Sequence, residues 1–276
     1  MRAVVLDAGG EPRLAEIAAP ATPAFRVLAC GLCGSDVEKI GRAPAGTVLG
    51  HEVVARRDDG RRVVPIHHLP CGECERCRAG HESTCERFAA ATIVPGGLAE
   101  AIEETAAVEL ADGIDDATGT YVEPLACVLR GAERVPPGRV VVVGQGFVGR
   151  LFAEVLRRRG DEVFTLDTNR ARAGRTPDGP VDAAVLCAPA APLELVRPGG
   201  TVLVFSPAAP VDLAEVYRHE LTLVGSRSAT PRHMAAAAAL LPELDVPEPT
   251  VLPLDRFAEG LELYRSGRAV KVVFAP

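Results

Sequence analysis

Four cysteines within fifteen residues constrain this chain more than any other feature of its sequence. The group consists of Cys71, Cys74, Cys77 and Cys85, with glycines and charged residues between them. Four thiolates this close together are able to surround one tetrahedral Zn²⁺ ion, and such a shell leaves no open position for a reactant. The spacing therefore predicts a structural zinc site. Reduced core cysteines or a disulfide pair are the alternatives, although the charged neighbours argue against core packing.

Length and composition exclude several classes of protein. The 276 residues suffice for one large domain or two modest ones, and 47% of them are hydrophobic. No apolar run reaches the roughly 18 residues that a membrane span requires. Residues 1–7 predict a first strand, since charges interrupt them too soon for a signal peptide. The net charge of −7 provides no basic surface for nucleic acid. Eight cysteines without a secretory signal indicate a reducing cytoplasm.

Two patterns divide the chain. Residues 1–120 contain short alternating apolar stretches broken by Gly, Pro and charged pairs, which is typical of a small, irregular β domain. A helix is predicted from 121 to 135. Strands are predicted at 140–143, 162–167, 181–187, 201–205 and 220–225, with a helix from 147 and a turn at 197–200. Strands that alternate with helical segments predict a parallel, doubly wound sheet.

Four further motifs carry a family resemblance. Cys33 lies in Cys-Gly-Leu-Cys-Gly-Ser-Asp, and Gly-His-Glu follows at residues 50–52. Val-Glu-Pro-Leu stands at 122–125, and Gly-Gln-Gly-Phe-Val-Gly at 144–149. In this order, and with the cysteine loop, the chain resembles the zinc-dependent medium-chain alcohol and polyol dehydrogenases over nearly its whole length.

The resemblance implies a mixed fold of α/β and β parts. A GroES-like β catalytic domain with the structural zinc loop would occupy residues 1–120. A truncated Rossmann domain, which is a doubly wound parallel sheet that binds NAD, would occupy 121–244. Residues 245–276 would return to the catalytic domain.

The predicted Rossmann domain is shorter than the family's. Only 13 residues separate Asp167 from Val181, where the family normally has a helix, a strand and another helix. The sequence therefore predicts loss of the third strand, which lies at an edge in the strand order 3-2-1-4-5-6. The crevice between strands 1 and 4, where the cofactor binds, would remain, with a shallower adenine pocket.

A catalytic zinc is predicted from the resemblance. An alcohol dehydrogenase needs a Lewis acid at the substrate oxygen, held by about three protein ligands with one position open. Cys33 would supply a thiolate and His51 an imidazole. The resemblance to polyol dehydrogenases makes Glu52 a ligand or near-ligand and places Glu123 opposite it. Which of the two carboxylates binds the metal stays open.

Residues near these predicted ligands are expected to have different roles. Ser35 matches the hydroxyl residue that, in the family, bonds the substrate alcohol and opens a proton relay; an ordinary turn serine is the alternative. Asp36 is expected to support the loop, and Cys30 to be a small buried residue rather than a ligand. His67 and His68 precede the cysteine loop, and one of them is a weak candidate for the substrate pocket.

The glycine motif predicts the nicotinamide cofactor site. It follows a predicted strand and opens a helix, which is the context that a dinucleotide-binding turn requires. The turn consists of Gly144, Gly146, Phe147, Val148 and Gly149. Gly144 allows the tight turn, Gly146 lets the pyrophosphate approach, and Gly149 permits close packing of helix and strand.

Asp167 ends the second predicted strand, 23 residues after Gly144. A carboxylate there accepts hydrogen bonds from both ribose hydroxyls and repels a 2′-phosphate, which favours NAD over NADP. Arg170 and Arg172 lie close in the sequence and leave NADP open.

The sequence therefore predicts an oxidoreductase with one catalytic and one structural zinc. It would transfer a hydride between NAD and a secondary alcohol or ketone, on a polyol, sugar or aminocyclitol. A carbonyl reductase running towards the alcohol, and a non-catalytic, zinc-stabilised nucleotide-binding protein, are the alternatives. The expected partners are the small-molecule substrate and further copies of the chain in a homodimer or homotetramer, with no nucleic acid and no membrane.

Overall fold

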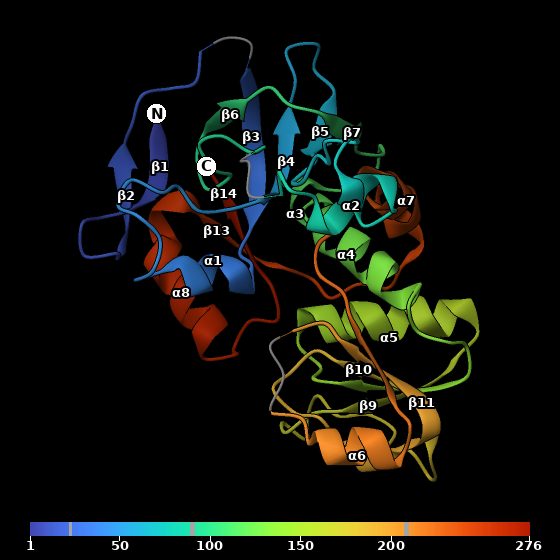
Figure 1. Cartoon of the computed structure of the whole chain (residues 1–276). Coiled ribbons are helices and arrows are strands. Elements are labelled where there is room, and N and C mark those ends of the chain that lie inside the picture. The colour runs from blue at the N-terminus through green and yellow to red at the C-terminus, as the bar shows by residue number, and fades with distance from the viewer. Residues whose placement is uncertain (22–23, 89–91, 207–209) are drawn as a thin grey trace. The chain divides into compact units, whose positions relative to one another are not determined.

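The computed structural model describes residues 1–21, 24–88, 92–206 and 210–276, and it divides into two compact units (Figure 1). The first unit comprises Met1–Pro124 and Thr230–Pro276, and the second comprises Leu125–Ala229. The first unit contains β1 (Arg2–Leu6), β2 (Pro12–Glu16), β3 (Ala24–Gly31), α1 (Gly34–Lys39), β4 (Glu52–Arg56), β5 (Arg62–Pro65), α2 (Glu75–Arg78), η1 (Glu82–Thr84), β6 (Ala101–Glu103), β7 (Ala107–Glu109) and α3 (Asp116–Gly119). After the second unit it continues with α7 (Pro231–Leu240), η3 (Leu241–Glu243), β13 (Thr250–Pro253), η4 (Leu254–Arg256), α8 (Phe257–Arg265) and β14 (Val272–Ala275).

The first unit is built on short, mainly antiparallel strands. Its larger sheet has the order β13-β14-β3-β4-β5-β7, with β6 also pairing to β3, while β1 and β2 form a separate antiparallel pair. The chain end enters this sheet, because Val273 pairs with Gly31 and Phe274 with Cys30. The helices before residue 120 are short, as expected for an irregular β domain.

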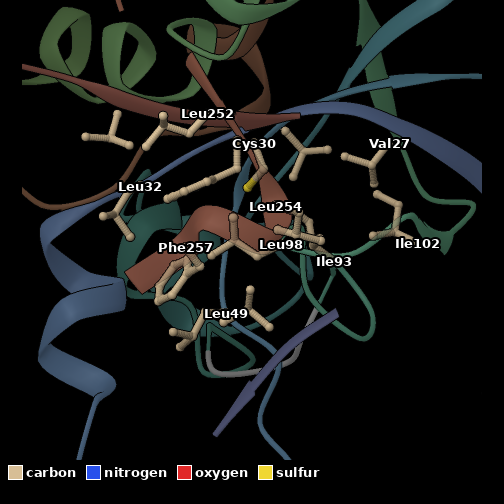
Figure 2. Packing of buried hydrophobic residues seen from close by; sticks show 14 of the residues in the cluster. Val27, Cys30, Leu32, Leu49, Ile93, Leu98, Ile102, Leu252, Leu254 and Phe257 are labelled. Carbon is tan, nitrogen blue, oxygen red and sulfur yellow. The ribbon is translucent and has the colours of Figure 1, made fainter. Parts of the chain in front are cut away.

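One apolar cluster forms the core of the first unit (Figure 2). Cys30 is fully buried in it, in the same cluster as Leu98 and Leu254. A Cβ atom on Gly50 or Gly97 would come within 2.7 Å or 2.9 Å of the Cys30 sulfur. Cys30 is therefore a small core residue, as predicted from the sequence.

The second unit is a parallel sheet with helices on both faces (Figure 1). It contains β8 (Arg139–Val143), α5 (Phe147–Arg159), β9 (Glu162–Leu166), β10 (Val181–Leu186), η2 (Leu193–Leu195), β11 (Val196–Val204), α6 (Leu213–Arg218) and β12 (Thr222–Gly225), and α4 (Val122–Ala132) contains the junction between the units. The strand order is β12-β11-β10-β8-β9, and every pairing is parallel. Three arginines complement the dipole at the end of α5, and the left-handed Gly160 (φ 96°) terminates the helix.

The predicted loss of a strand is confirmed. The sheet corresponds to strands 2, 1, 4, 5 and 6 of the doubly wound order, and residues 167–180 form no helix or strand. The edge of β9 is covered instead by the loop, since Thr165 donates to the Arg175 carbonyl (3.0 Å) and accepts from Gly174 (3.2 Å). The Arg175 guanidinium also lies 4.7 Å from the centre of the Phe164 ring. Covering an edge in this way limits pairing with other chains.

Two details differ from the sequence-based expectation. The turn expected at residues 197–200 is a bulge inside β11, because the pairing with β10 jumps from Val181–Val196 to Ala183–Thr201. The chain also returns to the first unit at Thr230, earlier than residue 245, because α7 packs against β7. Among the described residues, no helix is long and apolar enough to cross a membrane.

Candidate metal centres and active site

The cysteine loop brings its four thiols to one point. The sulfurs of Cys71, Cys74, Cys77 and Cys85 all lie within 4.8 Å of one another. The Cys71 and Cys77 sulfurs are 3.9 Å apart, close to the roughly 3.8 Å expected between two ligands of a tetrahedral zinc with Zn–S bonds of about 2.3 Å. This separation is far longer than a disulfide bond of about 2.05 Å. The donor set therefore fits a structural zinc and excludes the disulfide alternative for this pair.

Backbone N–H groups stabilise the thiolate form of two cysteines in the loop, Cys74 and Cys85. Cys74 lies at the start of α2, and hydrogen bonds from the backbone of Glu86 and Cys77 lower the pKa of its thiol to about 6. The backbone of Cys71 and Arg87 donates to the Cys85 sulfur at 3.4 Å and 3.3 Å, which lowers the pKa of that thiol. Both effects favour the deprotonated sulfur that binds a metal.

A second group of possible metal ligands lies between the end of β3 and the start of α1, together with the start of β4. The Cys33 sulfur, a His51 ring nitrogen and a Glu52 oxygen all lie within 4.8 Å of one another. Cys33 is the N-cap residue of α1, and Glu52 is the first residue of β4. Thiolate, imidazole and carboxylate form a zinc donor set with three protein ligands, so these residues fit a catalytic zinc.

Asp36 orients the imidazole of that group. Its carboxylate accepts hydrogen bonds from the backbone of Cys33 (3.2 Å) and Gly50 (3.1 Å) and lies 3.3 Å from His51 Nδ1. Burial of Asp36 opposes ionisation, but the charge of His51 and these hydrogen bonds hold its pKa below the usual value. With Nδ1 directed at Asp36, His51 keeps Nε2 for a metal, a typical arrangement for a ligand histidine.

Glu52 is also part of a buried ion pair that the sequence did not indicate. The Lys271 ammonium donates to Glu52 Oε2 and to the Leu32 carbonyl (3.1 Å). Burial raises the pKa of Glu52, and Lys271 opposes that shift. Gly31 makes room for the pair, since a Cβ there would collide with the Glu52 carboxylate. The sequence signal for this pair is a lysine directly before the apolar strand β14.

Glu123 joins a different group from Glu52. Its carboxylate, one nitrogen of His51 and one of His67 all lie within 4.8 Å of one another. His67 Nδ1 is 3.6 Å from Glu123 Oε1, and the rings of His51 and His67 stack with centroids 4.4 Å apart. From the sequence, His67 was a weak candidate for the substrate pocket; the structure places its ring against that of the predicted ligand His51.

Two hydroxyl groups lie near Cys33. The exposed Ser35 donates to the Cys33 sulfur at 3.5 Å. A Cβ on Gly34 would lie 3.0 Å from the Tyr264 hydroxyl. Burial, with the charges of Cys33 and Glu52, raises the pKa of Tyr264 to about 12. The sequence carries no signal for Tyr264, which follows the second unit by many residues.

The glycine turn between β8 and α5 has the geometry of a phosphate cradle. Gly144 has φ +89°, and a side chain on Gly149 would collide with the Gly144 carbonyl oxygen. A Cβ on Gly146, the N-cap of α5, would meet nothing within 4 Å. The open space lies at the N-terminus of α5, a helix of thirteen residues, where backbone N–H groups favour an anion. The turn therefore fits a dinucleotide cofactor.

Asp167 holds the glycine turn as well as facing a cavity. Its two oxygens accept from the backbone of Gln145 and Asn169, each at 2.7 Å. A cavity of about 530 Å³ beside it is lined by residues that include Gly144, Asp167 and Glu194. No lysine or arginine is among the described residues lining this cavity.

The first unit matches a known domain family. Residues 24–111 match the alcohol dehydrogenase GroES-like domain. D-altritol 5-dehydrogenase of Agrobacterium fabrum is 30% identical over 296 aligned positions, which cover 87% of this chain and 88% of that protein. The chain belongs to the zinc-dependent medium-chain dehydrogenase/reductase family. L-galactonate-5-dehydrogenase of Escherichia coli, a further relative, is 27% identical over 79% of each chain.

The fold agrees with this membership. The cobalt- and zinc-bound alcohol dehydrogenase of Pyrobaculum aerophilum aligns over 100% of this chain and 99% of its own, with a TM-score of 0.84 and 23% identity. The predictions of family, fold class and enzyme class are thereby confirmed: this chain is an oxidoreductase of the zinc-dependent medium-chain dehydrogenase/reductase family. The roles predicted for individual residues remain proposals.

Proposed function

We propose that this chain is a zinc- and NAD-dependent dehydrogenase that interconverts a secondary hydroxyl of a polyol or sugar acid with the ketone. The observation that carries the proposal is the convergence of Cys33, His51 and Glu52 within 4.8 Å. The names of two relatives support the substrate class, because one acts on an alditol and the other on a sugar acid, each at carbon 5.

The proposed roles follow from the site's geometry. When bound, zinc supplies a Lewis acid at the substrate oxygen, and the nicotinamide cofactor exchanges the hydride. Cys33 and His51 hold the metal, with a carboxylate from Glu52 or Glu123. Asp36 fixes the His51 ring by accepting from Nδ1. Lys271 donates to Glu52 and offsets part of its charge, and Glu123 is the other carboxylate that lies beside His51.

Ser35 is the proposed proton acceptor. Its hydroxyl lies 3.5 Å from the Cys33 sulfur, so it borders the position that a substrate oxygen would take. Because Ser35 is exposed, a proton taken from the substrate hydroxyl can pass on to water. Ser35→Ala should therefore slow turnover while zinc content stays at the wild-type value.

The cavity beside Asp167 supports NAD over NADP. Two carboxylates, Asp167 and Glu194, line it, and a 2′-phosphate of about −2 charge would be repelled by both. Neither Arg170 nor Arg172 is among its lining residues, which is a second observation in favour of NAD.

Zinc stoichiometry and a substrate screen test the proposal together. Two zinc ions per chain, and reduction of NAD by alditols or sugar acids, are expected. His51→Ala should lose the catalytic zinc and nearly all turnover, while NAD affinity changes little, because the glycine turn belongs to the other unit. The matched control is His219→Ala, at a partly exposed histidine of the second unit, and this variant should behave as wild type.

The alternatives give different results. One zinc per chain with no turnover of any alcohol or ketone would support the non-catalytic nucleotide-binding protein. Turnover seen only with ketones and NADH would support the carbonyl reductase. The homodimer or homotetramer and the cytoplasmic location stay predictions from the sequence.

A further inference from the structure

His67 was not among the predicted metal ligands, but it lies in a group of side chains that could hold a metal ion. With His51 and Glu123, it offers two imidazole nitrogens and a carboxylate oxygen within 4.8 Å of one another. His51 and Glu123 are each 5% exposed, and His67 is partly buried. Two imidazoles and one carboxylate are a zinc donor set of the kind found in catalytic sites.

The two donor groups share one residue. Cys33 and Glu52 belong to the first group, His67 and Glu123 to the second, and His51 to both. Since His51 Nδ1 faces Asp36 at 3.3 Å, His51 has one nitrogen left for a metal. One ion at a time can use that nitrogen, so the two groups describe alternative positions for a single ion.

The two positions are similar in the charge that they offer the ion. A Zn²⁺ ion with the Cys33 thiolate carries one net positive charge. The Lys271 ammonium offsets the Glu52 carboxylate, to which it donates a hydrogen bond within a buried pair. In the second position Glu123 would supply one negative charge to the ion, as the Cys33 thiolate would in the first.

We propose that His67 is a ligand of the catalytic metal, and that His51, His67 and Glu123 form a second position for the ion beside that of Cys33, His51 and Glu52. This inference rests on the proposed function, since it assigns a further ligand to the same metal. His51 would be the ligand that both positions share. The chain's Cys33 and His67 are thus alternative partners of His51.

Zinc binding without Cys33 isolates the second position. Zinc content and zinc affinity, the latter by competition with a chelator, are measured in Cys33→Ala and in three double variants that add His67→Ala, His68→Ala or His67→Cys. His68 is the matched control, because its ring packs against that of His67 at a tilt, with centroids 3.9 Å apart, but belongs to neither donor group. The zinc of the four-cysteine loop reports that each variant is folded.

The expected result is two zinc ions per chain in Cys33→Ala and in its His68→Ala double variant. Adding His67→Ala should lower the affinity for the second zinc by more than about 100-fold, beyond the 10–100-fold that is typical of a group that only orients a ligand. His67→Cys should restore binding, because a thiolate also binds zinc.

Other results would contradict either the role of His67 alone or the proposed function as well. If Cys33→Ala retains one zinc, or if His67→Ala reduces affinity by less than about 100-fold, His67 is not a ligand, while the proposed function stands. If the wild-type protein itself holds one zinc, both the proposed function and this inference fail.

Discussion

Lys271 and Glu52 form an ion pair in the interior of the first unit, although 219 residues separate them in the chain. Their side chains are 3% and 2% exposed. The pair links the residue directly before β14 to Glu52 at the start of β4, beside the residues proposed to hold the catalytic metal. A buried pair of this kind matters most when one partner is removed, since the other charge is then left uncompensated.

Lys271→Met should therefore destabilise the protein by about 3–5 kcal/mol, as measured by denaturant unfolding. Arg268→Ala is the control, because Arg268 pairs with Glu262 at the surface, with both side chains more than half exposed; it should cost less than about 1 kcal/mol. The double variant Lys271→Met/Glu52→Gln should recover part of the loss. Equal effects of Lys271→Met and Arg268→Ala would contradict the role given to the pair.

Cys77→Ser should remove one zinc per chain and lower the thermal stability. A four-thiolate site has no spare ligand, and a serine hydroxyl binds zinc poorly. Metal content and the unfolding temperature measure the effect. Cys127→Ser, outside the loop, should leave zinc content unchanged; a Cys77→Ser protein with wild-type zinc content would show that the loop holds no structural ion.

Asp167→Ala should weaken NAD binding. The protein's preference for NAD over NADP, given by the ratio of the two dissociation constants, should fall by about 10-fold or more, which corresponds to about 1.4 kcal/mol. The variant removes a charge from the cavity and two hydrogen bonds to the backbone of Gln145 and Asn169. Dissociation constants for both cofactors give the ratio. Asp178→Ala, at an exposed ion pair away from that cavity, is the control. An unchanged ratio after Asp167→Ala would mean that other residues select the cofactor.

Asp182 should contribute an acid-dependent part of the stability of the second unit. Hydrogen bonds from the Arg139 backbone (2.8 Å) and the Arg197 side chain (2.6 Å) lower its pKa. The folded pKa is below the ordinary value of about 3.9, so the stabilisation is present above that value and is lost as pH falls through the folded pKa.

Asp182→Asn should then cost about 1 kcal/mol at neutral pH and little at the lowest pH at which the protein stays folded. Unfolding free energies over this acid range measure it. Asp178→Asn, whose side chain is 69% exposed, serves as the control and should cost less. A constant difference between wild type and Asp182→Asn at all pH values would show that the loss is not linked to ionisation.

Local sequence determined those features whose residues lie close together in the chain. The cysteine loop spans fifteen residues, so only short chain segments separate the four sulfurs that converge. The glycine turn likewise depends on local backbone conformation, with Gly144 at positive φ and no room for a side chain at Gly149. The missing strand also followed from length, because 13 residues cannot form a helix, a strand and a second helix.

Tertiary structure alone decided the contacts between distant segments. The pairing of Lys271 with Glu52, and the stacking of His67 on His51 beside Glu123, depend on how strands from different parts of the chain pair in the first unit. The motifs show that Glu52 and Glu123 are present, but they do not show which of the two carboxylates the buried Lys271 neutralises. That choice follows from burial, since an ammonium and a carboxylate placed together out of water must satisfy each other.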